Sequence, residues 1–117
     1  MTHEAVYQMP FSRVYPLLEA KALRKGRTRD EVLAVVFWLT GYVPADIDRL
    51  LASSVTYGDF FRSAPALHPN RALVRGSVCG VRIEAIGDPL MQDIRRLDKM
   101  IDELSRGRPL NRILRTP

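Results

Sequence analysis

Cysteine and histidine are scarce in this sequence, and their scarcity excludes several kinds of site. The 117 residues contain a single cysteine, Cys79, so the chain cannot form an internal disulfide. The two histidines, His3 and His68, are too scattered to make a zinc site with it, because a structural zinc typically needs four ligands at tight spacing. No phosphate-binding loop or dinucleotide fingerprint is present. We therefore expect neither a metal centre nor a cofactor.

Long hydrophobic runs are missing as well. None approaches the ~20 apolar residues that a membrane-spanning helix requires, and the N-terminal residues lack the pattern of a secretory signal. We predict a cytoplasmic protein that has no membrane segment. Since repeats and low-complexity segments are also absent, residues 1–117 are expected to form a single domain, in which residues 1–10 are an irregular lead-in.

The sequence does contain strong helix signals, and the clearest mark residues 28–41. Thr28 and Glu31 have the spacing of a capping box, and Gly41 suits the end of a helix. The residues between them are apolar on almost every side, which is typical of a buried helix. We expect three of them to be almost fully buried: Val35, Val36 and Leu39.

A second long helix is predicted over residues 88–106, with Asp88 as its N-cap and Pro89 in its first turn. Residues 81–85 alternate between apolar and charged side chains, which favours at most one short strand pair near residues 72–86. The predicted fold is therefore mainly α, a compact domain of about five to six helices in which helix 28–41 is central.

The long helix has an apolar seam at spacings of four and three residues, as in a short coiled coil. Such a seam could pack on helix 28–41 or on a second copy of the chain, and we predict a homodimer through it. The seam residues are Leu90, Ile94, Leu97, Ile101 and Leu104.

Positive charge gathers in three stretches that contain no acid, within a chain of net charge +5. The first forms a candidate polyanion surface: Lys21, Arg24, Lys25, Arg27 and Arg29. The last lies near the C-terminus: Arg106, Arg108, Arg112 and Arg115. If such stretches converge in the fold, they bind a polyanion with strong salt dependence. If they point apart they are solvated surface, which is the interpretation we favour.

The middle stretch contains a more specific candidate, an anion site made of Arg71, Arg75 and Arg82. Guanidinium groups bind carboxylate and phosphate with two hydrogen bonds, and Gly76 and Gly80 would let the backbone approach an anion. The alternative is that these glycines make turns and the arginines pair with acids of the chain. We favour this alternative.

Residues 28–40 and 44–53 have the layout of a helix–turn–helix DNA-binding motif. A recognition helix contacts phosphates and is expected to carry Lys and Arg. From Asp30 to Phe61, however, five acids face one base, so the net charge of this region is minus four. We therefore interpret the two helices as packed members of an α-bundle.

Four blocks of sequence carry a family resemblance: KGRT (25–28), WLTGY (38–42), VCGVRIE (78–84) and DPLMQDIRRLDKMIDEL (88–104). Together they resemble the bacterial domain-of-unknown-function family 2200, over nearly the whole chain from Tyr7 to Arg115. The resemblance implies a small stand-alone prokaryotic protein. It implies no activity and no catalytic or binding residue.

We favour a small non-enzymatic bacterial binding or interaction module that self-associates. The alternative is a nucleic-acid-binding accessory protein that uses a basic surface. A third hypothesis is a small enzyme centred on Cys79 with His68 as its base. A reactive thiol needs an exposed, electropositive setting, whereas we expect Cys79 to be a buried structural thiol between two valines. We assign no catalytic residue.

Overall fold

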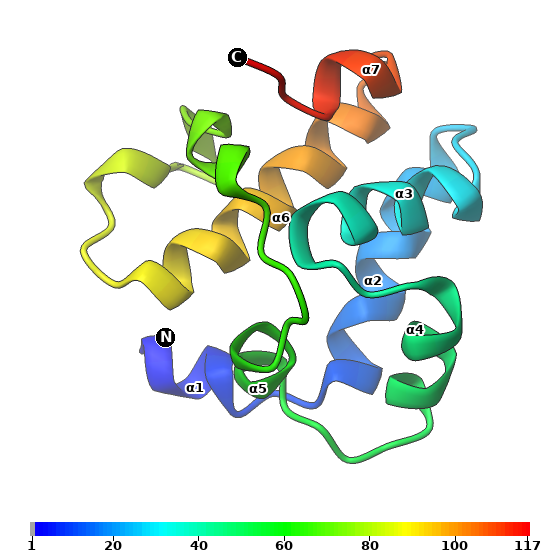
Figure 1. Cartoon of the computed structure of the whole chain (residues 1–117), viewed down its shortest axis with the longest axis vertical. Coiled ribbons are helices and arrows are strands. Elements are labelled where there is room, and N and C mark those ends of the chain that lie inside the picture. Colours follow the sequence, from blue (N-terminus) through cyan, green and yellow to red (C-terminus); the bar gives the residue numbers. More distant parts are fainter. Residues whose placement is uncertain (1) are drawn as a thin grey trace.

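Residues 2–117 are described by a computed structural model, in which seven α-helices enclose one core (Figure 1). The helices are α1 (His3–Tyr7), α2 (Phe11–Arg24), α3 (Arg29–Thr40), α4 (Pro44–Leu51), α5 (Tyr57–Arg62), α6 (Pro89–Ser105) and α7 (Leu110–Ile113). Between α5 and α6 lie two 3-10 turns, η1 (Pro69–Leu73) and η2 (Ile83–Ala85), and one hairpin of β1 (Ser77–Val78) and β2 (Val81–Arg82). The predicted mainly α fold with one short strand pair is confirmed.

The N-terminal residues differ from the prediction of an irregular lead-in, which is wrong for residues 3–7. Helix α1 forms there because the Thr2 hydroxyl accepts a hydrogen bond from the Ala5 N–H and caps the helix. The Tyr7 hydroxyl also donates a hydrogen bond to Asp88, the residue that caps α6. The lead-in is thus a helix tied to the start of the longest helix, while Met1 lies outside the described residues.

Helix α3 has the bounds that its capping signals predict. Thr28 and Glu31 form the reciprocal capping box, and Gly41 ends the helix with a φ of +83°. Only glycine fits there easily, because a Cβ atom would also lie 2.9 Å from Ala66. Val35, Val36 and Leu39 are 0–1% exposed, as expected. The helix is not buried on every side, however, since 53% of Phe37 faces solvent.

Helix α6 crosses the middle of the molecule and contacts α2, α3, α5, α7 and the hairpin (Figure 1). Four residues of its apolar seam are at most 2% exposed and pack inside the chain: Ile94, Leu97, Ile101 and Leu104. Leu90 is partly buried beside them. The seam therefore belongs to the core of the monomer. Self-association stays a prediction, but a surface other than the seam would have to mediate it.

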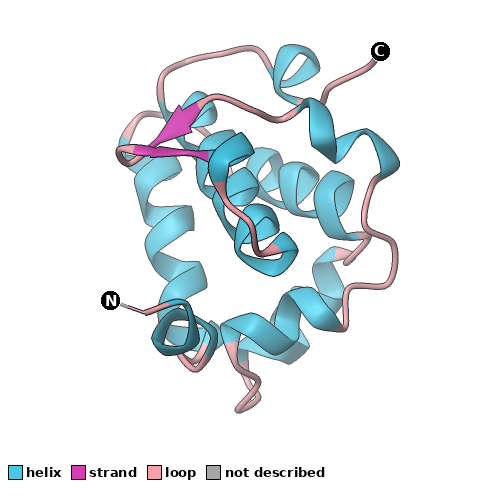
Figure 2. Cartoon of the chain, turned by 90° about the vertical axis from the view of Figure 1, so that its left-hand side faces the viewer, coloured by secondary structure: helices cyan, strands magenta, loops and turns pink. Residues whose placement is uncertain are grey.

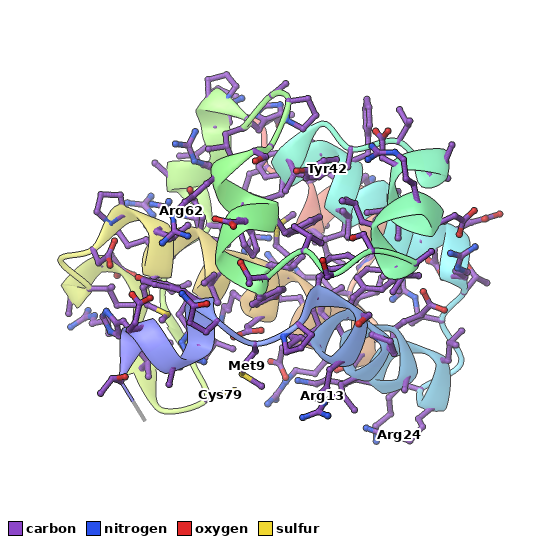
Figure 3. The ribbon with its side chains drawn as sticks, turned by 90° about the horizontal axis from the view of Figure 1, so that it is seen from below. Met9, Arg13, Arg24, Tyr42, Arg62 and Cys79 are labelled. Carbon is purple, nitrogen blue, oxygen red and sulfur yellow. The ribbon has the colours of Figure 1, made fainter. Side chains whose placement is uncertain are left out.

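The hairpin lies against α6, and its register pairs Ser77 with Arg82 and Val78 with Val81 (Figure 2). Cys79 and Gly80 form its two-residue turn, with φ angles of +52° and +76°. Such a turn directs its central side chains away from the core, so Cys79 is exposed (Figure 3). The prediction of a buried thiol is wrong, because two flanking valines do not bury a residue at the tip of a turn.

Candidate functional site at the end of helix α6

Basic side chains from three parts of the sequence meet where α6 ends. We call this surface the cationic end, and its basic residues are Lys21, Arg24, Lys25, Arg27, Lys99, Arg106, Arg108 and Arg115. Helices α2 and α6 both finish here, at Arg24 and Ser105. The C-terminal carbonyls of a helix carry partial negative charge, so both ends favour cations. Arg24 points outward at the end of α2 (Figure 3).

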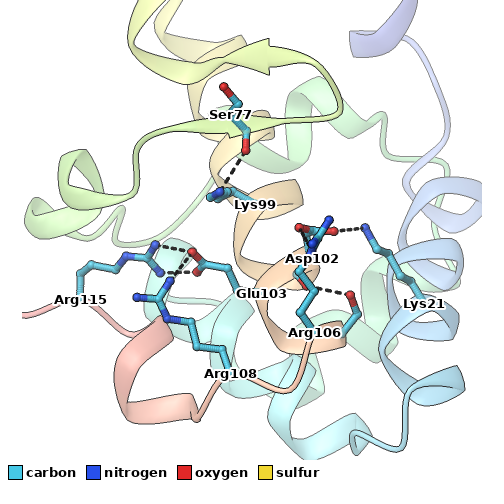
Figure 4. Close-up of polar contacts among 9 residues, drawn as sticks. Lys21, Ser77, Lys99, Asp102, Glu103, Arg106, Arg108 and Arg115 are labelled. Atoms are coloured by element: carbon cyan, nitrogen blue, oxygen red, sulfur yellow. Dashed lines mark hydrogen bonds and ion pairs between the residues drawn. The ribbon is translucent and has the colours of Figure 1, made fainter.

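Asp102 joins two of the basic stretches. Its carboxylate accepts hydrogen bonds from the Lys21 ammonium at 3.0 Å and from Arg106 Nε at 2.9 Å (Figure 4). Burial opposes the ionisation of Asp102, but the hydrogen bonds and charges of Lys21 and Arg106 outweigh it, and they hold the pKa below its ordinary value. Asp102 is therefore ionised at neutral pH and fixes both cations in place.

Glu103 anchors the C-terminal segment in the same way, from the neighbouring position on α6. Its side chain is only 7% exposed, and its oxygens accept hydrogen bonds from Arg108 at 2.8 Å and from both terminal nitrogens of Arg115 at 2.5 and 2.7 Å (Figure 4). A buried carboxylate needs such partners, because an unpaired charge in the interior is costly. Glu103 thus folds the chain after α7 back onto α6.

Arg27 connects the start of α3 to this end. Its Nη1 donates to the carbonyl oxygens of Leu104 at 3.1 Å and Arg108 at 2.8 Å, and its Nε and Nη2 donate to Glu31. Leu104 is in the last turn of α6 and Arg108 follows the helix, so Arg27 adds a charged donor to the partly negative carbonyls at this helix end. The hydrogen bonds from Arg27 and from the Thr28 backbone lower the pKa of Glu31 to about 2.

Two open hollows lie side by side on the cationic end and share Asp102 and Arg106 in their walls. One has a volume of about 410 Å³ and is also lined by Ser77, Lys99, Glu103 and Arg108. The other, of about 520 Å³, is also lined by Lys21, Lys25 and Ser105. Arg106 stands between them and is 78% exposed. Each hollow therefore presents basic groups to solvent on a surface that an anion can reach.

Basic residues outnumber acids at this end. Its eight basic residues adjoin four acids, Glu31, Asp98, Asp102 and Glu103, which leaves an excess of four positive charges. The whole chain has a net charge of +5, from 18 basic and 13 acidic residues. An approaching polyanion is therefore attracted to one end of the molecule.

The sequence identified part of this surface. Lys21, Arg24 and Lys25 belong to it, as does Arg27, but Arg29 points elsewhere and pairs with Glu19 at 3.3 Å and Asp48 at 2.9 Å. Asp102 brings one residue of the first basic stretch, Lys21, beside one residue of the last, Arg106, so these two stretches do not wholly point apart. Lys99 was missed, because a single lysine in a mixed-charge helix gives no local signal.

The three arginines of the predicted anion site do not share one hollow. Arg71 pairs with the buried Asp93 at 3.0 Å and lines a hollow of about 260 Å³ that neither Arg75 nor Arg82 reaches. Arg82 lies 3.6 Å from Glu84, and Arg75 is exposed. The Gly76 N–H donates to Glu84 at 2.6 Å. Arg71 and Arg82 thus pair with acids of the chain, as in the interpretation that we favoured.

Cys79 and His68 have separate surroundings. The His68 ring stacks on Trp38, with ring centroids 4.2 Å apart, and its Nδ1 accepts a hydrogen bond from the Asn70 N–H. No group of three or more His, Cys, Asp or Glu side chains within residues 2–117 is arranged to hold a metal ion. Over the same residues, no helix is both long and apolar enough to cross a membrane.

Comparisons with known proteins place this architecture in a family. Residues 5–115 match the model of a family described as an uncharacterized protein conserved in bacteria, DUF2200. The chain is also similar to the crystal structure of an uncharacterized protein, SP1917, at 49% sequence identity and a TM-score of 0.91. That similarity covers 97% of this chain and 93% of the other. No curated protein matches the chain.

Proposed function

We propose that this protein, which belongs to the DUF2200 family, is a non-enzymatic binding module that holds a polyanion such as nucleic acid at its cationic end. The observation that supports the proposal is the charge distribution, since eight basic residues and only four acids gather where α2 and α6 end. A polyanion releases counterions when basic side chains replace them, so a concentrated excess favours binding more than the same charge spread over the surface.

The basic residues of the cationic end divide into two groups. One group is held by acids or carbonyls of the fold and maintains the surface: Lys21, Arg27, Lys99, Arg108 and Arg115. Arg24 and Lys25 are exposed, and Arg106 contacts Asp102 through one edge only while most of its side chain faces solvent. These outer groups can reach phosphates, and a guanidinium binds phosphate with two parallel hydrogen bonds.

The proposal is tested by the binding of a fluorescently labelled, mixed-sequence oligonucleotide, followed by anisotropy at increasing salt. We expect binding at low salt and a steep loss of affinity as salt is added. The double variant Arg24→Glu/Lys25→Glu should lose at least about tenfold in affinity, because it reverses two charges within the patch.

A matched control reverses the same number of charges outside the patch, in the variant Arg75→Glu/Arg82→Glu. Both double variants have the same net charge, so a difference between them reports the position of the charges. Binding that survives in the control and falls in the Arg24→Glu/Lys25→Glu variant supports the cationic end. An absence of binding at low salt, or an equal loss in both variants, would overturn the proposal.

Self-association is proposed separately and does not depend on the polyanion. Light scattering of the free protein tests it, and a mass near 13.3 kDa would exclude a dimer. Because the seam on α6 is part of the core, a dimer would have to use exposed apolar residues instead, such as Phe37 or Val43.

A further inference from the structure

A hollow of different character lies on the outer side of α3. It has a volume of about 420 Å³ and is lined by Ala34, Phe37, Trp38, Gly41, Ala66, His68 and Leu114. We call it the aromatic cleft, because three of its seven residues carry aromatic rings and the others are apolar or glycine. Phe37 is exposed, and Trp38 and His68 are half-buried beside it. Concave sites lined mainly by apolar and aromatic side chains are typical of ligand binding.

The walls of the aromatic cleft are held in place before any ligand arrives. The backbone N–H groups of Ala66 and His68 donate to the carbonyls of Thr40 at 2.9 Å and Leu39 at 3.1 Å, which fixes this segment to the end of α3. The ring of His68 lies nearly parallel to that of Trp38, at 15°. A preformed site binds without the cost of ordering its own side chains.

The size and chemistry of the aromatic cleft restrict what can occupy it. A stable interface with a second chain takes roughly 20–30 residues a side, far more than line this cleft. Its volume instead suits a single small group. Since aromatic rings line it and His68 is its sole titratable residue, it favours a flat, aromatic and uncharged group.

The C-terminal segment joins the cationic end to the aromatic cleft. Leu114 lines the cleft, and the next residue, Arg115, pairs with Glu103 at the cationic end. A ligand with charged and aromatic parts close together would complement both surfaces.

We propose that the aromatic cleft receives an unpaired base of a single-stranded nucleic acid whose phosphates lie on the cationic end. This inference rests on the proposed function and adds to it a preference for single strands over duplexes. Proteins that bind single strands combine a basic groove for the backbone with aromatic side chains on which bases stack. In a duplex the bases are already paired and stacked, so they cannot enter the cleft.

The fluorescence of Trp38 can report binding in the cleft, because Trp38 is the single tryptophan of the chain and lines the cleft. We would titrate the protein with a 12-nucleotide single strand, the same strand made abasic, the corresponding duplex and the free nucleosides. We expect the base-bearing strand to quench the fluorescence of Trp38. The abasic strand and the duplex should bind, as anisotropy measures it, without quenching.

The variant Phe37→Ala should weaken binding of the base-bearing strand by about 5- to 150-fold, because one stacked base is lost. It should leave the affinity for the abasic strand unchanged. Leu17→Ala is the matched control, since Leu17 is an apolar side chain that is 65% exposed on α2 and lies outside the cleft lining. It should affect neither strand.

Two outcomes separate this inference from the proposed function. Equal affinity for base-bearing and abasic strands, without quenching of Trp38, would overturn the inference and leave the polyanion surface intact. Quenching by free nucleosides at the same base concentration would also contradict it, because the cleft would then act without the cationic end. If no polyanion binds at low salt, the proposed function fails and the inference fails with it.

Discussion

The arginines of residues 71–82 and the basic residues of the cationic end differ in what faces them. Arg71 meets the buried Asp93, which also accepts from Arg96, and Arg82 lies beside Glu84. In that region acids of the chain take the place that an external anion would need. At the cationic end eight basic residues share four acids, and Arg24 and Lys25 stay exposed.

This difference shows that a run of basic residues in a sequence is a poor guide to the electric field of the protein. Residues 71–82 are free of acids along the chain, but Glu84 and Asp93, which pair with Arg82 and Arg71, come from other elements. Asp93 lies on α6, 22 residues after Arg71. What distinguishes the two regions is therefore the pairing across the fold, and variants can test it.

The largest loss of stability is expected from a substitution in the buried seam of α6, the helix that contributes to both regions. Leu97 is fully buried in the seam, so Leu97→Ala removes apolar contacts and leaves a cavity. We expect the free energy of unfolding to fall by about 2–5 kcal/mol, as measured by urea denaturation. If the seam were instead a dimer interface, the variant would lower the mass seen by light scattering and leave the stability of the monomer intact.

A smaller loss is expected when the buried anchor of the cationic end is neutralised. Glu103→Gln leaves Arg108 and Arg115 without a carboxylate, which should cost about 1.5–3 kcal/mol. The equivalent change in the other region, Glu84→Gln, affects a side chain that is 44% exposed, so the free energy of unfolding should fall by less than in Glu103→Gln. Equal losses in the two variants would show that burial does not separate the regions.

The smallest loss of stability is expected at low pH, where Glu31 becomes protonated and its ion pair with Arg27 is lost. The pKa of Glu31 falls from 4.5 to about 2 in the folded protein, so the folded state favours its ionised form. This contribution to stability is complete above pH 4.5 and is lost as the pH falls towards 2. The melting temperature of the Glu31→Gln variant should therefore change less than that of the natural protein between these pH values. Parallel curves would contradict the role of Glu31.

Local signals in the sequence were sufficient for much of the fold. The capping box at Thr28, the glycine at position 41 and the proline after Asp88 set the bounds of α3 and α6 correctly. Each of these signals acts within one turn of backbone, so neighbouring residues contain all the information needed. The missed helix α1 is short, and its cap, Thr2, has no apolar run behind it to indicate a helix.

The aromatic cleft was partly visible in the sequence. Phe37 and Trp38 belong to the apolar run of α3, which was interpreted as burial on every side. A helix that packs on neighbours along one side cannot bury its whole circumference, so one face of such a run remains exposed. The partner of Trp38, His68, comes from a distant loop, and nothing in the sequence links the two rings.

Local sequence signals were enough to set the bounds of α3 and α6, and composition was enough for the net charge. The tertiary structure alone decided that the α6 seam faces inward, that Cys79 is exposed, that Arg29 turns to Glu19 and Asp48, and that Lys21 and Arg106 meet at Asp102. The two kinds of feature differ in how far apart along the chain the interacting residues lie. Capping and periodicity act between neighbours in the chain, whereas a charged patch is a sum over residues that only the packing of helices brings together.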